Sequence, residues 1–291
     1  PRGDIRDRNN DLLAADRQCY SVYADPSLVE DPATTALLLS AWLGLSEEEV
    51  YPQLVKRDAK GKPRQFVYVK RWLTDEEQAA YDEISDRLGK GVGLVSEPRR
   101  LYPEGELAAH VLGFANREGK GAEGIECVFD DYLEARPGLL RSRVDARRVL
   151  LPSLVEKQVE PEGGHTVVLT IDKGIQFLLE RELDRALERT KAPRGMGVVL
   201  DPCSGAILAM ACRPAFDPNR YNEYTPEEYR NRAVVDVFEP GSSFKLVTFS
   251  AAFENALITP ETLFDCEGGY YNPYGHCISD YHKMGIEPVT R

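Results

Sequence analysis

The strongest constraint on the fold is a pair of apolar strands that follows a long amphipathic helix. The segment GVVLDPCSGAILAMA, residues 197–211, holds two apolar runs joined by turn-forming residues at 201–205. Such a pattern is typical of an antiparallel hairpin. Before it, Asp172 can cap a helix whose apolar residues recur at helical spacing on one face: Ile175, Leu178, Leu179, Leu183, Ala186 and Leu187. The pattern predicts helices packed on an antiparallel sheet.

Helix-start signals and one strand pattern organise the first half of the chain. Ser46 and Glu49 have the spacing of a capping box, in which two side chains satisfy backbone N–H groups at a helix start. Thr74 and Glu77 repeat this spacing. Residues 65–71 (QFVYVKR) alternate between apolar and polar, as a half-buried strand does. We therefore expect this half to be α+β, with long irregular connections.

A glycine-rich, acidic stretch near the middle of the chain is the best linker. This segment, EPEGG at residues 160–164, divides the chain into two predicted domains, residues 1–164 and 165–291. Within the second, Thr225 precedes a proline and two acidic residues. A capping residue, a proline at the first helical position and acids in the first turn predict a helix, which we expect to run towards Asp236.

The overall charge narrows the classes of partner. The 291 residues carry 36 basic and 48 acidic side chains, which gives a formal net charge of −12. We expect no nucleic-acid partner, because phosphate neutralisation needs a basic surface. No apolar run reaches the length of about 18 residues that spans a bilayer.

The cysteines suggest a local cross-link and leave a metal site as the alternative. Cys266 and Cys277 flank the predicted hairpin CEGGYYNPYGHC, where an oxidising compartment could bridge them. The alternative is a zinc site that adds His276 and His282 to the two cysteines. Its spacing fits no finger or ribbon pattern, so we favour the disulfide over zinc.

The segment EPGSSFK, residues 239–245, carries the clearest chemistry. If a helix starts at Ser242, then Lys245 lies on the same face, with Cβ atoms roughly 5–6 Å apart. A serine needs a neighbouring base to become a nucleophile, and a neutral lysine can act as that base. Burial and the positive end of the helix dipole both favour the neutral amine. The alternative is that Ser242 only caps the helix and that Lys245 is an ordinary surface lysine.

Several blocks in order resemble the class B, monofunctional penicillin-binding proteins. These are the segment RGDIRDRNNDLLA at residues 2–14, the segment at 99–133 that contains AAHVLGFANREGKGAEGIE, and the run from LTIDKGIQ to EPGSSFK. Asn10 stands where the family usually has glycine, and asparagine tolerates the left-handed backbone that glycine allows. The short first domain is most similar to the division-type members.

The resemblance implies a fold and a function. It implies an N-terminal, non-catalytic pedestal domain of the dimerisation type, followed by the first part of a transpeptidase domain of the penicillin-binding and β-lactamase-like fold. Ser242 would be the nucleophile and Lys245 the general base of a peptidoglycan D,D-transpeptidase. Its implied ligands are D-Ala-D-Ala stem peptides and β-lactams, its implied partners are cell-division or cell-wall synthesis proteins, and no metal or organic cofactor is implied. Members of the family act at the outer face of the bacterial cytoplasmic membrane, held by an N-terminal helix that this sequence does not contain.

Two expected motifs are absent, which opens rival interpretations. The family's Ser-x-Asn and Lys-Thr-Gly motifs do not occur after Lys245. We therefore expect this chain alone to be inactive and to expose apolar surface in its second half. One rival is a non-enzymatic scaffold for cell-division partners. Another is a serine β-lactamase or β-lactam sensor, which the long N-terminal half argues against. We interpret His110 as a packed, hydrogen-bonded histidine rather than as a catalyst.

Overall fold

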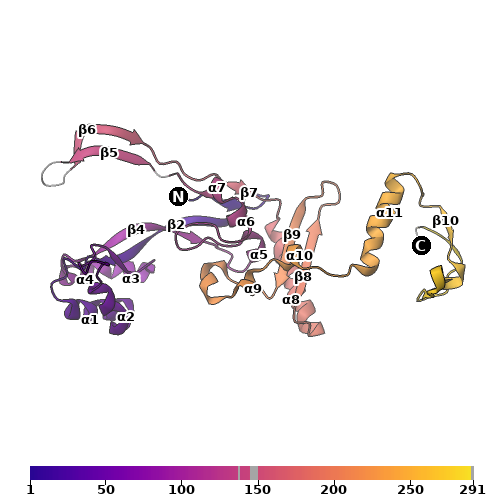
Figure 1. Cartoon of the computed structure of the whole chain (residues 1–291), viewed down its shortest axis with the longest axis horizontal. Coiled ribbons are helices and arrows are strands. Elements are labelled where there is room, and N and C mark those ends of the chain that lie inside the picture. Colours follow the sequence, from indigo (N-terminus) through magenta and orange to yellow (C-terminus); the bar gives the residue numbers. More distant parts are fainter. Residues whose placement is uncertain (137, 145–149, 290–291) are drawn as a thin grey trace. The chain divides into compact units, whose positions relative to one another are not determined.

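The computed structural model describes residues 1–136, 138–144 and 150–289 and divides into two compact units. The first unit is Pro1–Val235 and the second is Asp236–Arg291 (Figure 1). Among the described residues, no helix combines the length and the apolar character needed to cross a membrane.

The first unit is a mixture of strands and helices. Its strands are β1 (Ile5–Arg6), β2 (Leu12–Ala24), β3 (Val67–Lys70), β4 (Val92–Leu101), β5 (Leu139–Val144), β6 (Leu150–Val159), β7 (Val167–Val168), β8 (Gly195–Leu200) and β9 (Ile207–Arg213). Its helices are α1 (Pro32–Leu43), α2 (Glu47–Leu54), α3 (Asp75–Ala79), α4 (Tyr81–Leu88), α5 (Ala109–Leu112), α6 (Gly124–Val128), α7 (Asp130–Leu133), α8 (Lys173–Thr190), α9 (Pro226–Tyr229) and α10 (Arg232–Val235), with a 3-10 helix η1 (Pro218–Glu223). This composition confirms the α+β fold class.

A long strand, β2, organises the largest sheet. It pairs antiparallel with β4 along most of its length, from Ala15 opposite Leu101 to Ala24 opposite Val92. It also pairs antiparallel with β1 at its start and with β3 at its end. The strand β7 joins β1 in parallel. Strands β5 and β6 form a separate antiparallel pair, and so do β8 and β9.

The predicted helix starts are confirmed by their hydrogen bonds. Glu49 N donates to Ser46 Oγ at 3.3 Å, while the Glu49 carboxylate accepts from the Ser46 N–H at 3.1 Å. Thr74 and Glu77 make the same reciprocal pair. Both capping boxes begin helices in the part of the first unit that contains α1 to α4. The core of this part combines residues of β2 and β4 with residues of α1, α2 and α4. That core contains Val22, Ala24, Ala36, Leu39, Leu43, Val50, Leu54, Leu73, Leu88 and Val92.

A second core joins the start of the chain to residues after β9. Its buried members are Ile5, Leu13, Ala14, Tyr102, Ala108, Ala109, Leu112, Phe114, Leu133 and Phe216. Phe216 is fully buried, and its ring meets those of His110 and Phe114 edge to face at 5.2 and 6.3 Å between centroids. Tyr221 stacks on Phe114 at 4.4 Å. Residues on both sides of the linker at 160–164 therefore share one core.

A buried charge network links two of the sequence blocks singled out above. Glu126 is fully buried and accepts from Arg2 Nε at 2.7 Å and from Arg100 Nε at 2.6 Å. Arg2 also pairs with Asp130 at 2.7 Å. Burial, together with the Glu126 carboxylate, holds the pKa of Tyr102 well above its usual range. Buried charges persist only when they are paired, so these contacts fix the blocks against each other.

The turn between β1 and β2 is held by Asp7. This residue is fully buried, and its carboxylate accepts backbone N–H bonds from Asn9, Asp11 and Lys173, the first residue of α8. Burial alone would raise the pKa of Asp7, but these three N–H donors outweigh it and lower the pKa. Asn10, at the tip, has φ +72°, which confirms the expected left-handed backbone.

The predicted helix and hairpin of the second half are present. Asp172 caps α8 by accepting from the N–H groups of Gly174 and Ile175, and β8 pairs antiparallel with β9. The helix packs so closely on the hairpin that a Cβ at Gly197 would lie 2.8 Å from Leu179 Cδ1. The helix predicted from Thr225 to about Asp236 is wrong in extent: the backbone of Arg230 is extended (ψ 119°) and separates α9 from α10.

The second unit is small. It consists of the 3-10 helix η2 (Gly241–Phe244), α11 (Lys245–Glu254), β10 (Leu263–Asp265), η3 (Glu267–Gly269), β11 (Tyr270–Tyr271), η4 (Pro273–Gly275), β12 (Ile278–Ser279) and β13 (Ile286–Pro288). Strand β10 pairs antiparallel with β13, and β11 with β12.

The possible disulfide between Cys266 and Cys277 is not formed. In the hairpin, Tyr270 lies opposite Ser279 and Tyr271 opposite Ile278. Cys266 instead bonds through its backbone N–H to the carbonyl of Gly285, outside the β11–β12 ladder. This register keeps Cys266 and Cys277 from facing each other, and both are free thiols. Within the described ranges, no group of three or more His, Cys, Asp or Glu side chains is placed to hold a metal ion.

Candidate active site

Ser242 and Lys245 lie at the junction of a 3-10 turn and a helix. Ser242 is the second residue of η2, and Lys245 is the first residue of α11. The Lys245 N–H donates to the carbonyls of Ser242 and Ser243, which closes the turn. In a 3-10 helix, side chains three apart nearly eclipse each other. The local fold therefore places Ser242 and Lys245 on one side of the turn, as the spacing predicts.

A glycine makes this turn possible. Gly241 has φ +52°, a left-handed conformation that side chains rarely adopt. Pro240 before it accepts the N–H of Ser243 at 3.1 Å. The proline and the glycine together reverse the chain immediately before Ser242, so the serine stands at the very start of the helical segment.

The burial that would favour a neutral Lys245 is absent in this chain, whereas the expected exposure of apolar surface in its second half is confirmed. Ser242 and Lys245 are both exposed, and within the part of the chain that the structure describes their side chains have no hydrogen-bonding partner. The apolar side chains of η2 and α11 are exposed too: Phe244 by 56%, Leu246 by 75%, Val247 by 57%, Phe249 by 39% and Phe253 by 39%. A helix that is apolar over much of its surface is normally covered, so this surface is suited to contact with further protein.

In the first unit, a buried carboxylate joins α8 to β9 and to the residue before α5. Glu180 Oε1 accepts from the Ala108 N–H at 2.8 Å and from Gln176 Nε2 at 2.6 Å. Its other oxygen accepts from Arg213 Nη2 at 3.1 Å. Arg213 also pairs with Asp184 at 2.5 Å. Burial lowers the pKa of Arg213, but the two carboxylates outweigh burial and raise it.

We call the cluster formed by Gln176, Glu180, Asp184 and Arg213 the polar joint. The sequence pattern did not predict it. The apolar stripe of α8 predicts a buried leucine face, yet Gln176 is fully buried and Glu180 is 7% exposed, while Leu178 is 48% exposed. The signal available in the sequence is the spacing of Gln176 and Glu180, four residues apart and therefore on one face of the helix. Their burial depends on partners that are distant in the sequence.

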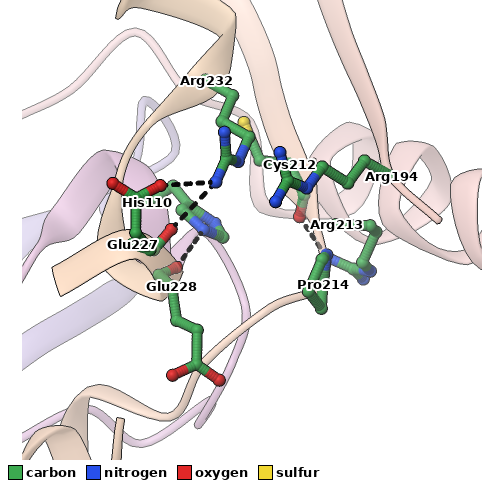
Figure 2. A pocket seen from close by; sticks show the side chains of 8 residues that line it. All are labelled: His110, Arg194, Cys212, Arg213, Pro214, Glu227, Glu228 and Arg232. Carbon is green, nitrogen blue, oxygen red and sulfur yellow. Dashed lines mark hydrogen bonds and ion pairs between the residues drawn. The ribbon is translucent and has the colours of Figure 1, made fainter. Parts of the chain in front are cut away.

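A small cavity of about 90 Å³ lies beside this joint (Figure 2). Among its lining residues, His110 Nε2 donates to the Glu228 carbonyl at 3.0 Å, and Arg232 Nη2 bonds Glu227 Oε2 at 3.1 Å. Burial lowers the pKa of His110. The histidine is 7% exposed, which confirms that it is packed and hydrogen-bonded. These contacts connect α5 to α9 and give His110 a structural role.

Comparison with known proteins identifies both halves of the chain. Residues 1–169 match the family model described as the penicillin-binding protein dimerisation domain. Residues 195–290 match the model described as the penicillin-binding protein transpeptidase domain. Ser242 and Lys245 therefore lie in the second match, and the Arg2–Glu126 network lies in the first.

Characterised relatives align over most of the chain. The peptidoglycan D,D-transpeptidase FtsI of Escherichia coli (strain K12) is 32% identical over 291 residues, which cover 99% of this chain and 48% of that protein. The stage V sporulation protein D of Bacillus subtilis (strain 168) is 36% identical over 259 residues, which cover 87% of this chain and 38% of that protein. The chain thus spans half or less of the length of these relatives.

Solved structures share the fold. A penicillin-binding protein, PBP2, determined in complex with MreC from Helicobacter pylori, superposes with a TM-score of 0.74 at 22% identity, over 99% of this chain and 58% of that one. A peptidoglycan synthetase from Bifidobacterium adolescentis superposes with a TM-score of 0.62 at 25% identity, over 98% of this chain and 55% of that one.

Proposed function

This chain belongs to the penicillin-binding protein family, and from that membership we propose that the protein is a peptidoglycan D,D-transpeptidase with Ser242 as nucleophile and Lys245 as general base. One observation carries the assignment of the residues. Ser242 and Lys245 stand three apart at the start of a helix, inside the segment that matches the transpeptidase domain. The domain division proposed with it is residues 1–164 for the pedestal and 165–291 for the transpeptidase part.

The proposed reaction proceeds in two steps. In the first step, Lys245 accepts the hydroxyl proton of Ser242 while Oγ attacks the carbonyl carbon of the penultimate D-alanine. The peptide bond to the terminal D-alanine breaks, and that residue leaves with a proton on its new amine. An amine of a second stem peptide then attacks the serine ester, which releases Ser242 and forms the cross-link. A β-lactam enters the first step as a substrate mimic.

Further groups are needed to complete the site. After Lys245, the chain contains no Lys-Thr-Gly and no Ser-x-Asn sequence. By the family resemblance, the first of these motifs supplies a wall of the cleft and a donor to the oxyanion. Losing one such donor costs about 10²–10³-fold in rate in serine enzymes. We therefore expect this chain alone to react poorly with a β-lactam.

The test is covalent labelling with a fluorescent penicillin, followed by mass mapping of the labelled peptide. It compares this chain with a longer form of the protein that carries both further motifs. The expected result is a label on Ser242 in the longer form, abolished by Ser242→Ala and strongly reduced by Lys245→Gln. Ser243→Ala is the matched control, because it removes the neighbouring hydroxyl from the same turn. A label that survives Ser242→Ala in a folded protein refutes the assignment.

The lifetime of the acyl-enzyme separates a transferase from a β-lactamase. A transpeptidase holds the penicilloyl group for a long time, because its site excludes deacylating water. A β-lactamase releases it within a catalytic cycle. Rapid loss of the label from Ser242, followed by repeated turnover, would replace the transferase proposal by the lactamase alternative.

The proposal extends to partners and location. The structurally similar PBP2 of Helicobacter pylori was solved in complex with MreC, and with this support we propose that the pedestal of this protein binds a protein of cell-wall synthesis or cell division. We place the protein at the outer face of the cytoplasmic membrane, where stem peptides are cross-linked. A pull-down with residues 1–235, which form one compact unit, tests the partner. A scaffold without enzymatic activity would bind such a partner but would not be labelled at Ser242.

A further inference from the structure

Three buried side-chain polar atoms have no hydrogen-bond partner among the described residues, namely Ser40 Oγ, Trp72 Nε1 and Arg100 Nη2, and the last two belong to side chains that line one cavity. The indole nitrogen of Trp72 and Nη2 of Arg100 are both buried, and neither has a hydrogen-bond partner among the residues that the structure describes. The Arg100 side chain is only 4% exposed, and its other nitrogens are occupied by Glu126 and Asp16. Buried hydrogen-bond donors are almost always paired. The unpaired Trp72 Nε1 and Arg100 Nη2 therefore indicate that an acceptor group binds near them.

The side chains of Trp72 and Arg100, which carry these unpaired nitrogens, line the same small cavity. Its volume is about 40 Å³, and Trp72, Arg100 and Tyr102 are among its lining residues. One water needs roughly 10–15 Å³ of such volume, so the cavity has room for the two oxygens of a carboxylate. The cavity is therefore lined by donors and has the size of a small acceptor group.

The charge around the cavity favours an anion. Arg99 and Arg117 line it as well, and neither forms an ion pair with any residue in the described ranges. The Arg99 guanidinium lies over the Trp72 ring at 5.4 Å, and that of Arg71 at 4.9 Å. The positive guanidinium groups of Arg71 and Arg99 therefore lie next to the Trp72 indole, whose N–H has no acceptor in the part of the chain that the structure describes. Opposite charge next to a site stabilises the bound anion most strongly where water is excluded.

The position of Trp72 is fixed by its backbone. Its φ is +57°, a conformation that bulky residues rarely adopt, and its N–H donates to Ser21 Oγ at 2.8 Å. Ser21 is itself fully buried and bonds Glu97. The indole is therefore held in place by the strand β2 and cannot easily turn to find another acceptor.

We propose that this cavity is a binding site for a single carboxylate group, held by Trp72 Nε1 and Arg100 Nη2. Asp16 also lines the cavity and already accepts from the Arg2 N–H at 2.7 Å. Its negative charge disfavours a doubly charged ion such as hydrogen phosphate, whereas a monoanionic carboxylate matches one neutral and one cationic donor. The group can belong to a free small acid or to an acidic residue of a peptide.

The experiment uses the two tryptophans of the chain as probe and control. Trp42 Nε1 already donates to the Glu77 carbonyl at 3.0 Å and Trp42 does not line the cavity, so its indole signal is an internal reference. Acetate, N-acetyl-glutamate amide and phosphate are titrated into the ¹⁵N-labelled full chain at constant ionic strength, with chloride as the balancing anion. The expected result is a saturable shift of the Trp72 indole cross-peak with both carboxylates and none for Trp42. Tighter binding of the glutamate derivative than of acetate assigns the group to a peptide, and the reverse assigns it to a free acid.

Two sets of variants test the mechanism. The double variant Arg99→Ala with Arg117→Ala keeps both donors and is expected to weaken acetate binding roughly fivefold. Trp72→Phe removes the indole donor, and its acetate binding, followed by isothermal calorimetry, is expected to be lost while Trp42 stays unperturbed. The proposal is overturned if Trp72 and Trp42 shift together, if chloride produces the same shift as acetate, or if phosphate alone binds.

Discussion

Replacing Glu180 by alanine removes the centre of the polar joint between α8, β9 and the residue before α5. The variant leaves the Ala108 N–H without its acceptor and takes one of two carboxylates from Arg213. Removing one partner of a buried pair costs about 3–5 kcal/mol. Because Arg213 keeps Asp184 at 2.5 Å, the lower end applies, and we expect a loss of about 3 kcal/mol.

The assay is urea and thermal unfolding of residues 1–235, followed by circular dichroism. A loss of about 3 kcal/mol corresponds to a melting temperature lower by about 6–12 °C in a domain of this size. Glu182→Ala is the matched control: it lies on the same helix, is 54% exposed and pairs with Arg181 and Arg185 at the surface. That variant should unfold like the unaltered protein, because exposed ion pairs contribute little.

The neutral variant Glu180→Gln separates geometry from charge. It keeps an oxygen that can accept from Ala108 but loses the charge that faces Arg213, so we expect a loss smaller than that of Glu180→Ala. If Glu180→Ala unfolds within about 0.5 kcal/mol of Glu182→Ala, the joint contributes nothing to stability and the reasoning fails.

Two further predictions concern the same unit. Burial lowers the pKa of His110, so the unfolded chain binds the proton more readily and the free energy of unfolding should fall as the pH drops below about 6.5. Urea unfolding at pH 7.5 and 6.0 checks this, and the fall should shrink in His110→Gln but persist in a variant of the exposed His165. Gly113→Ala should abolish folding or cost more than about 4 kcal/mol, because its Cβ would lie 1.9 Å from the Glu123 carbonyl oxygen at φ +69°. Gly105→Ala, with φ +59° and open space, should cost only about 1 kcal/mol by thermal melting, and equal losses would refute the steric argument.

Local patterns predicted the elements that local forces determine. The caps at Ser46, Thr74 and Asp172 rest on side chains two or three residues from the backbone they bind, so sequence alone suffices to find them. The hairpin of β8 and β9 follows from its two apolar runs and the turn-forming residues between them in the same way. The relation of Ser242 to Lys245 is also local, which is why the turn has the expected form.

Features that depend on distant partners were not predictable. The burial of Glu180 requires Arg213 and the Ala108 N–H, neither of which the helix pattern reveals. Phe216 joins a core built largely from the first 133 residues, although it follows the predicted linker. The exposure of α11 differs from these two cases: its own pattern predicts burial, and the exposure was expected from the absence of the Ser-x-Asn and Lys-Thr-Gly motifs.

The parallel pairing of β1 with β7 has a consequence for synthesis. Ile5 pairs on one side with Ala14, which is close in sequence, and on the other side with Val167, which is synthesised much later. A ribosome adds about 5–20 residues per second, so one edge of β1 stays open for roughly 8–30 s after its other edge is paired. An open edge can capture a strand from another nascent chain. Because β1 is short (Ile5–Arg6), it exposes few backbone hydrogen-bonding groups to another chain before β7 pairs with it.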